Sequence, residues 1–331
     1  HDIIQYLLRD DKLHEKHYIN LQSNCRQKHY KNILKLAEAF TDKTRYYEEA
    51  FEILSSQNQE DTGLEIYKWK TNEELHNKIT DAINKLLKEE LGEQYDELKT
   101  NDKRLNVTFG LYDNGFVNQS TYNYTEFLKL EELQILTPYR TGHYGPLNVN
   151  SLIQTNYRKK NNSKLTSNFY HADKIIRLRN WYDRRGQDKR LILSNGSIGI
   201  INDHNQGRER KYYFKDAETA LNYVGDEEYF DLAYTITVHK SQGSDFENVL
   251  LIIPNKLTLL CKELLYTGLT RSKSKLILFI HERLHNQTKK RPNCILGTPR
   301  HVRYKKILQG LAAKKKRLPR TRTIRTSNNN R

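Results

Sequence analysis

The chain has 331 residues, of which 36% are hydrophobic, and its mean hydropathy is −0.87. This length allows one large domain or two ordinary ones with a sizeable core. No apolar run approaches the roughly 20 residues that span a bilayer, and residues 1–11 are too acidic for a signal peptide. These features exclude a membrane-spanning chain, and we expect a soluble, cytoplasmic protein without a membrane partner.

The formal net charge of +16 is concentrated at one end of the chain. Residues 283–331 carry 16 Lys and Arg and no Asp or Glu, which leaves 40 basic and 40 acidic side chains in residues 1–282. A tail of this composition is predicted to be partly disordered and to attract phosphates in a salt-dependent manner. The alternative is a solvated tail without a dedicated partner.

The cysteines and the first residue bear on the class of protein. Cys25, Cys261 and Cys294 lie far apart and form no CxxC pair, so they predict reduced thiols and no metal site. The chain begins at His1 and contains no Met, which predicts a fragment of a longer protein.

The elements expected in the N-terminal half are mostly helical. A short apolar run at 18–21 predicts a strand, and apolar spacing predicts helices over 28–56 and 72–99. Residues 134–137 predict a second strand, followed by a glycine-containing loop and a helix over 147–155.

The C-terminal half contains two regions with different sequence patterns. Residues 173–235 contain short β-rich pieces separated by turns, with Asn195-Gly196 as a tight-turn signal. The apolar runs 249–254 and 275–280 enclose a predicted helix over 261–271. Continuous apolar strands around a helix are typical of a parallel sheet covered on both faces, so the predicted fold class is α/β.

Two segments of this half carry chemistry: TITVHKSQGSDFENVLLIIP at 235–254 and ELLYTGLTRSKSKLILF at 263–279. In the first, small, polar and basic groups follow a strand, where open α/β sheets bind ligands. Exposed amides with His239, Lys240 and Ser241 suit phosphates. In the second, Arg271 can present a planar fork to phosphate oxygens.

These segments resemble the fifth and sixth conserved motifs of superfamily 1 helicases of the UvrD/RecD-like type, in wording, order and spacing. YINLQSNCRQ at 18–27 resembles the fourth motif, with Cys25 in place of the usual aromatic residue. LQILTPYRTGHYG, ADKIIRLRNWYD and LSNGSIGIIN resemble the RecD-like group, in which a Src-homology-3-like barrel interrupts the second RecA-like domain. The resemblance touches residues 18–27 and 133–280.

The resemblance implies a RecA-like parallel sheet flanked by helices, the second motor domain of a P-loop NTPase, with a helical insertion and a small β-barrel insertion. The implied parts are 1–40 and 131–170 for the start of this domain, 41–130 for the largely helical insertion, 171–233 for the β-barrel, 234–282 for the remainder with motifs five and six, and 283–331 for the basic tail.

The resemblance also implies a nucleotide site. In this family ATP lies between two RecA-like domains, and the second domain supplies arginines that reach the γ-phosphate. The matching positions, and the expected catalytic residues, are Arg26 and Arg271; such arginines raise rates by about 10³–10⁵. Gly243, Asp245 and Tyr266 match nucleotide-binding positions, with Asp245 where the family usually has Glu. Gly268 stands where Ala is common.

Single-stranded DNA is the implied partner, and Thr237, His239 and Lys240 would hold its phosphates. Arg140 is expected either near the nucleotide or as a structural clamp. Without the other motifs, Arg26 would be interpreted as a surface ion pair and His239 as an ordinary polar histidine. Aromatic residues of the β insertion could stack on bases but are expected to form its core and rim: Tyr212, Tyr213, Phe214 and Tyr229.

No GxxxxGK[ST] phosphate loop occurs in the sequence. ATP and Mg²⁺ are therefore expected to be held mainly by an N-terminal RecA-like domain of the same protein, and this fragment alone should be inactive. The sequence predicts the C-terminal motor half of an ATP-dependent DNA helicase. The alternative is a non-catalytic nucleic-acid-binding or interaction module derived from a helicase; a motor fused to a nuclease is a third, unsupported by any visible Asp/Glu/Lys cluster.

Overall fold

The computed structural model describes residues 31–38, 53–54, 63–118, 124–159, 168–183, 190–204, 209–217, 220–222, 227–255 and 262–290. The strand expected at 18–21, Arg26, all three cysteines and the tail beyond residue 290 lie outside these residues.

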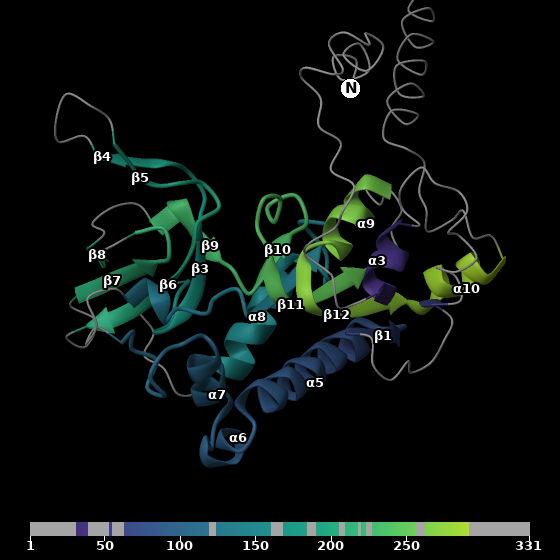
Figure 1. Ribbon diagram of the computed structural model, residues 1–331, viewed down its shortest axis with the longest axis horizontal. Coiled ribbons are helices and arrows are strands. Elements are labelled where there is room, and N and C mark those ends of the chain that lie inside the picture. The colour runs from purple at the N-terminus through teal and green to yellow at the C-terminus, as the bar shows by residue number, and fades with distance from the viewer. Residues whose placement is uncertain are drawn as a thin grey trace, which may run out of the picture.

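Five strands form the central sheet, and every neighbouring pair is parallel. Their spatial order is β1-β12-β11-β2-β10 (Figure 1). The strands are β1 (Leu64–Trp69), β2 (Leu133–Thr137), β10 (Thr235–Thr237), β11 (Phe246–Ile253) and β12 (Ser272–His281). Because the strands are parallel, all their C-terminal ends lie on one side of the sheet and all their N-terminal ends on the other. We call these two sides the C-terminal edge and the N-terminal edge.

Helices cover both faces of this sheet (Figure 1). One face packs against α3 (Lys31–Glu38), α9 (Lys262–Leu269) and α10 (Glu282–Lys290), and the other against α5 (Asn72–Leu91), α7 (Asn101–Thr108) and α8 (Pro146–Tyr157). Alternate residues of β11 serve the two cores, with Val249 and Leu251 on the α9 side and Leu250 and Ile252 on the α5 side. This two-sided burial explains the uninterrupted apolar runs in the sequence.

The longest helix, α5, has identifiable ends. Thr71 accepts a hydrogen bond from the Glu74 amide at 3.2 Å, and Glu74 accepts one from the Lys70 amide at 2.8 Å. The helix ends at Gly92, which has a φ of +53°. That left-handed conformation suits glycine, so the helix expected to continue to residue 99 ends earlier and is followed by α6 (Gln94–Glu97).

The β insertion forms a separate antiparallel unit between β2 and β10 (Figure 1). Its five-stranded sheet has the order β8-β7-β6-β3-β9, and β4 and β5 form a second, two-stranded sheet. The strands are β3 (Asp173–Arg177), β4 (Trp181–Asp183), β5 (Arg190–Leu193), β6 (Ile198–His204), β7 (Glu209–Phe214), β8 (Leu221–Asn222) and β9 (Phe230–Leu232). The predicted turn at Asn195-Gly196 separates β5 from β6, with Gly196 at a φ of +97°.

The fold class predicted from the sequence is confirmed: the chain is α/β, with a central parallel sheet between helices. Closure of the β insertion into a Src-homology-3-like barrel stays a prediction, as do the domain boundaries. One element differs from the expectation. Residues 64–69, placed by the sequence in the helical insertion 41–130, form β1 at the edge of the central sheet.

Two short 3₁₀ turns complete the elements, η2 (Tyr124–Glu126) and η3 (Glu227–Tyr229). Within the described ranges, no helix combines the length and the apolar composition that crossing a membrane requires.

Candidate nucleotide and nucleic-acid sites

The segment between β10 and β11 positions most of the predicted site residues. Thr237 pairs with Thr137 of β2, whereas Phe246 pairs with Ser272 at the start of β12. In a parallel sheet the intervening residues must therefore return from the C-terminal edge to the N-terminal edge. We call residues 238–245 the crossover segment.

The crossover segment is built from turns. The Lys240 and Ser241 amides donate to the Thr237 carbonyl at 2.9 and 3.2 Å, and the Ser244 amide donates to the Ser241 carbonyl at 3.1 Å. Ser241 is buried, and its hydroxyl donates to the Val238 carbonyl at 2.8 Å. Ser241 is thus a structural residue of the turn, while His239 and Lys240 are exposed.

The predicted nucleic-acid residues gather at the C-terminal edge. Thr237 ends β10, and Arg140 lies in the loop that follows β2, the neighbouring strand. Partial burial lowers the pKa of Lys240; the Asp231 carboxylate opposes this shift, and the positive charge of Arg140 adds to it. Arg140 thus follows β2 at the same end of the sheet as Thr237 and Lys240, whereas Arg271 precedes β12 at the opposite end.

The predicted nucleotide residues gather at the opposite edge, around Arg271. This residue precedes β12, and its side chain is 13% exposed. Its Nη1 donates to the Ser244 carbonyl at 2.9 Å, and its Nε donates to the Thr267 carbonyl at 3.1 Å. Asp245 Oδ1 lies 3.9 Å from Nη1. Arg271 thus ties the end of α9 to the end of the crossover segment.

Two glycines near Arg271 have different reasons for lacking a side chain. Gly243 has a φ of +89°, and a Cβ there would meet no atom within 4 Å. A Cβ on Gly268 would lie 3.2 Å from both Leu251 methyl groups and 3.4 Å from Val238. Glycine at 268 therefore lets α9 approach both the sheet and the crossover segment closely.

The groups at this edge suit a nucleotide: a guanidinium, an open glycine backbone and Tyr266, which is 39% exposed. A cation and exposed amides can hold phosphates, and a tyrosine ring can pack on a base. Across the described ranges, no group of three or more His, Cys, Asp and Glu is arranged to hold a metal ion.

The aromatic residues of the β insertion mostly form its interior. Tyr212, Tyr213 and Phe214 are at most 2% exposed, as the core interpretation predicted. Tyr229 lies beneath two arginines, with the guanidinium carbons of Arg177 and Arg179 at 5.2 and 5.0 Å from its ring centre.

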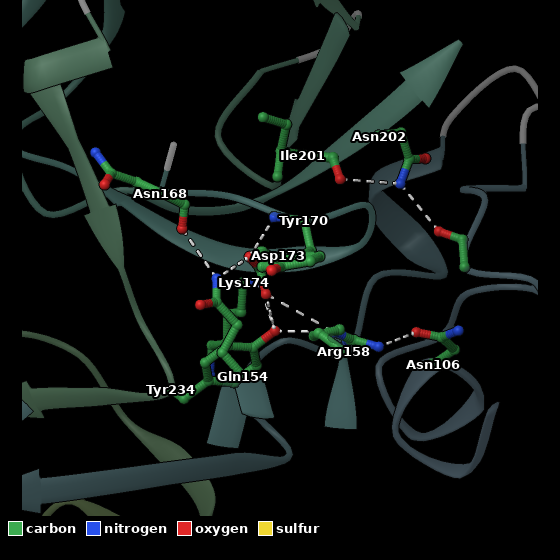
Figure 2. Close-up of polar contacts among 11 residues, drawn as sticks. Asn106, Gln154, Arg158, Asn168, Tyr170, Asp173, Lys174, Ile201, Asn202 and Tyr234 are labelled. Carbon is green, nitrogen blue, oxygen red and sulfur yellow. Dashed lines mark hydrogen bonds and ion pairs between the residues drawn. The ribbon is translucent and has the colours of Figure 1, made fainter. Parts of the chain in front are cut away.

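A buried polar network at the root of the β insertion was missed by the sequence analysis (Figure 2). Asp173 accepts hydrogen bonds from the Tyr234 hydroxyl at 2.8 Å and from Gln154 Nε2 at 2.6 Å. Arg158 Nε donates to the Tyr234 oxygen at 2.9 Å, and its Nη1 donates to Asn106 Oδ1 at 2.6 Å. We call Asn106, Gln154, Arg158, Asp173 and Tyr234 the root network.

Burial dominates the electrostatics of this network. It raises the pKa of Asp173 to about 6, although the nearby charge of Arg158 acts in the opposite direction. It lowers the pKa of the neighbouring Lys174 to about 7. Lys174 Nζ donates to the Leu130 and Leu133 carbonyls at 2.8 and 2.9 Å, which ties the start of β3 to the start of β2.

The network also fixes the exit from the insertion. Tyr234 immediately precedes β10, and Asn150 of α8 holds the same stretch. Asn150 Oδ1 accepts from the Thr235 amide at 2.6 Å, and its Nδ2 donates to the Leu232 and Thr235 carbonyls at 3.0 and 3.1 Å. The position of Thr237, two residues later, is therefore set by contacts at the root.

Comparisons with known proteins agree with the motif interpretation. Residues 232–279, which hold the crossover segment, α9 and most of β12, match the family model of the UvrD-like helicase C-terminal domain. The chain is 35% identical over 179 residues to an uncharacterized protein of Methanocaldococcus jannaschii, covering 47% of this chain and 15% of that protein. It is 33% identical over 165 residues to the RecBCD enzyme subunit RecD of Buchnera aphidicola, covering 48% and 26%.

Among solved structures, the chain is similar to the Pif1 helicase from Bacteroides in complex with ADP-AlF3 and single-stranded DNA. The likeness has 13% identity and a TM-score of 0.36, and it covers 90% of this chain and 57% of that chain.

The family model covers residues 232–279, and the two curated matches cover about half of this chain. These matches show a similarity to the C-terminal half of superfamily 1 helicases, in agreement with the two motifs. The matched regions span about a quarter or less of the two curated relatives' own lengths.

Proposed function

We propose that this chain is the second motor domain of an ATP-dependent DNA helicase that translocates on single-stranded DNA. Its parts would follow the boundaries expected from the sequence, with residues 41–130 as an insertion that also contributes β1. ATP and Mg²⁺ would be held mainly by an N-terminal RecA-like domain, and ATP turnover there would drive closing and opening between the two domains.

The residue roles divide between the two edges of the sheet. Arg271, with Arg26 outside the described residues, would hold charge on the γ-phosphate, and Gly243, Asp245 and Tyr266 would line the nucleotide. Thr237, His239 and Lys240 would contact DNA phosphates. Arg140 would join this second group, since it follows the neighbouring strand and its charge acts on Lys240.

One observation carries the proposal. The proposed contacts with single-stranded DNA lie at the start of the crossover segment. At its end, Arg271 holds the same segment through the Ser244 carbonyl. If the γ-phosphate of ATP displaced the Arg271 side chain, the crossover segment, which would hold the DNA, would move with it. Linkage of this kind is what a translocase needs, because nucleotide state must change the grip on DNA.

The test is Arg271→Ala in the full-length protein, measured as DNA-stimulated ATP hydrolysis. We expect kcat to fall by about 10³-fold or more. Lys273→Ala, which removes an exposed cation two residues further along β12, is the matched control and should leave turnover near wild type. Near-normal turnover in the Arg271 variant would refute the role.

Arg271 also has a structural role, so stability must be measured alongside turnover. Its two bonds to main-chain carbonyls predict some loss of thermal stability in the alanine variant. Arg271→Lys retains a cation but not the fork geometry. If the lysine variant is as stable as wild type and still hydrolyses ATP slowly, the loss of turnover is caused by the missing guanidinium contacts with phosphate and not by misfolding.

A further inference from the structure

The β4–β5 hairpin combines exposed aromatic, aliphatic and basic side chains, among them Tyr182, Leu191 and Arg190. Its two strands form a sheet of their own, not bonded to the five-stranded sheet, and they project at the outer end of the insertion (Figure 1). Neither the helicase motifs nor the proposed motor role uses this hairpin.

Two of the three residue pairs in the described part of the hairpin are apolar. Trp181 pairs with Leu193, and Tyr182 pairs with Leu191, with an irregularity between the two pairs; the third pair is Asp183 with Arg190. Leu193 is 1% exposed, and Trp181 packs against the insertion core that contains it. Tyr182 and Leu191 are 42% and 46% exposed. An exposed apolar pair therefore lies next to the pair that the insertion core covers.

The surroundings of this exposed pair are basic. Arg179 and Arg190 are exposed on the strand approaching β4 and at the start of β5. Residues 177–190 contain six basic and two acidic residues, a local excess within residues 1–282, whose charges balance as a whole. Part of that excess belongs to residues 184–189, outside the described residues. Arg190 pairs with Asp183 across the hairpin, so Arg179, Asp183 and Arg190 together leave one net positive charge, which attracts phosphates.

The tyrosine ring is held in place. Asn180 Nδ2 donates to the Tyr182 hydroxyl at 3.1 Å, and Asn180 Oδ1 accepts from the Asn195 amide at 2.7 Å. Asn195 lies in the tight turn between β5 and β6, so the ring is fixed relative to the five-stranded sheet. A fixed aromatic face beside arginines is the combination that binds single strands, since every base can stack on it.

We propose that Arg179, Tyr182, Arg190 and Leu191 form a second contact for single-stranded nucleic acid, separate from the Thr237–Lys240 group. A base stacks on the Tyr182 ring beside Leu191, and the two arginines contact flanking phosphates. A single strand fits better than a duplex, because pairing hides the base faces. The root network joins the insertion to β10, so a strand bound at the hairpin is held at a fixed position relative to Thr237.

The test measures binding of the whole chain to a fluorescein-labelled oligothymidylate by fluorescence anisotropy, without ATP. An oligonucleotide of about 30 nucleotides exceeds a single site of about 4–16 nucleotides and can reach both contacts. We expect Tyr182→Ala to bind about fivefold or more weakly than wild type. Tyr182→Phe keeps the ring and should bind like wild type, which separates stacking from loss of folding.

Tyr112→Ala is the matched control, since Tyr112 is 48% exposed but lies outside the insertion. It should leave the affinity unchanged. Arg190→Gln should reduce the slope of log affinity against log salt by about 0.7, the value for one phosphate contact on a single strand.

Equal affinity of Tyr182→Ala and Tyr112→Ala would overturn the proposal. Equal weakening on a blunt duplex would also overturn it, because stacking on a free base could not be the cause. Unchanged DNA affinity with altered ATP turnover in the parent enzyme would assign the hairpin to a protein contact instead. The binding experiment needs no nucleotide, so it stands apart from the Arg271 test of the proposed motor function.

Discussion

Asp173 is the residue whose replacement should reveal how firmly the β insertion is joined to the motor sheet. It is fully buried, accepts three hydrogen bonds of 2.6–2.8 Å from Gln154, Tyr170 and Tyr234, and lies 4.0 Å from Arg158 Nε. Asp173→Asn keeps the shape of the side chain but removes a carboxylate that is paired with this buried guanidinium.

The expected cost follows from the environment. Removing one partner of a buried ion pair leaves an uncompensated charge and typically costs about 3–5 kcal/mol. Asn also turns an NH₂ group toward donors that a carboxylate accepted, which adds to the loss. We therefore expect the free energy of unfolding at pH 7.5 to fall by about 3–5 kcal/mol.

Urea unfolding followed by circular dichroism and tryptophan fluorescence measures this loss. Asp96→Asn, at an exposed aspartate of α6, is the control and should change stability by at most about 0.5 kcal/mol. Adding Arg158→Met to Asp173→Asn removes the orphaned charge, so the double variant should be more stable than the single one. A loss below about 1 kcal/mol in Asp173→Asn, or a strictly additive double variant, would refute the reasoning.

Two further predictions concern packing and pH. Gly268→Ala brings a helix-propensity gain of about 1 kcal/mol, but its Cβ would lie 3.2 Å from both Leu251 methyl groups, so we expect the free energy of unfolding to rise by less than that gain; a full gain of about 1 kcal/mol would contradict the close approach of α9. Lys174, whose pKa burial lowers to about 7, binds a proton in the unfolded chain that the folded chain lacks between about pH 7 and 10. Stability should therefore rise with pH across that window, by up to about 1.4 kcal/mol per pH unit, and Lys174→Met should remove this rise in urea unfolding measured at several pH values.

The sequence predicted the strands that are buried on both faces and little of what borders them. Residues 249–253 of β11 and 276–280 of β12 are apolar at every position, as expected for strands covered on both faces. In contrast, β1 has the sequence LEIYKW with four half-buried positions, and among the described strands it has a single hydrogen-bonded neighbour, β12. Because β1 contains polar residues, the sequence analysis did not identify it as a strand and assigned it to the insertion expected to be helical.

The candidate sites were predictable only where a motif is contiguous. The crossover segment and α9 are each one stretch of sequence, and their residues do fall at the two edges of one sheet. The root network joins α7, α8, β3 and the residue before β10, and its charged members resemble surface residues in sequence. Tyr182 was missed for a related reason: nothing local distinguishes an exposed tyrosine on a hairpin from the buried Tyr212 and Tyr213.

The short strand β10 shows why the root of the insertion matters to the motor. It has three residues and one described neighbour, β2, so sheet bonding alone holds it weakly. Asn150 supplies three further hydrogen bonds at its start, and Gln134 Nε2 donates to the Ala233 and Tyr234 carbonyls at 3.1 and 3.0 Å. These contacts fix one end of the crossover segment, while Arg271 fixes the other. In the proposed motor, a change at Arg271 would move the residues between these two ends without shifting β10. The proposed phosphate contacts of His239 and Lys240 would then change while the insertion keeps its place on the sheet.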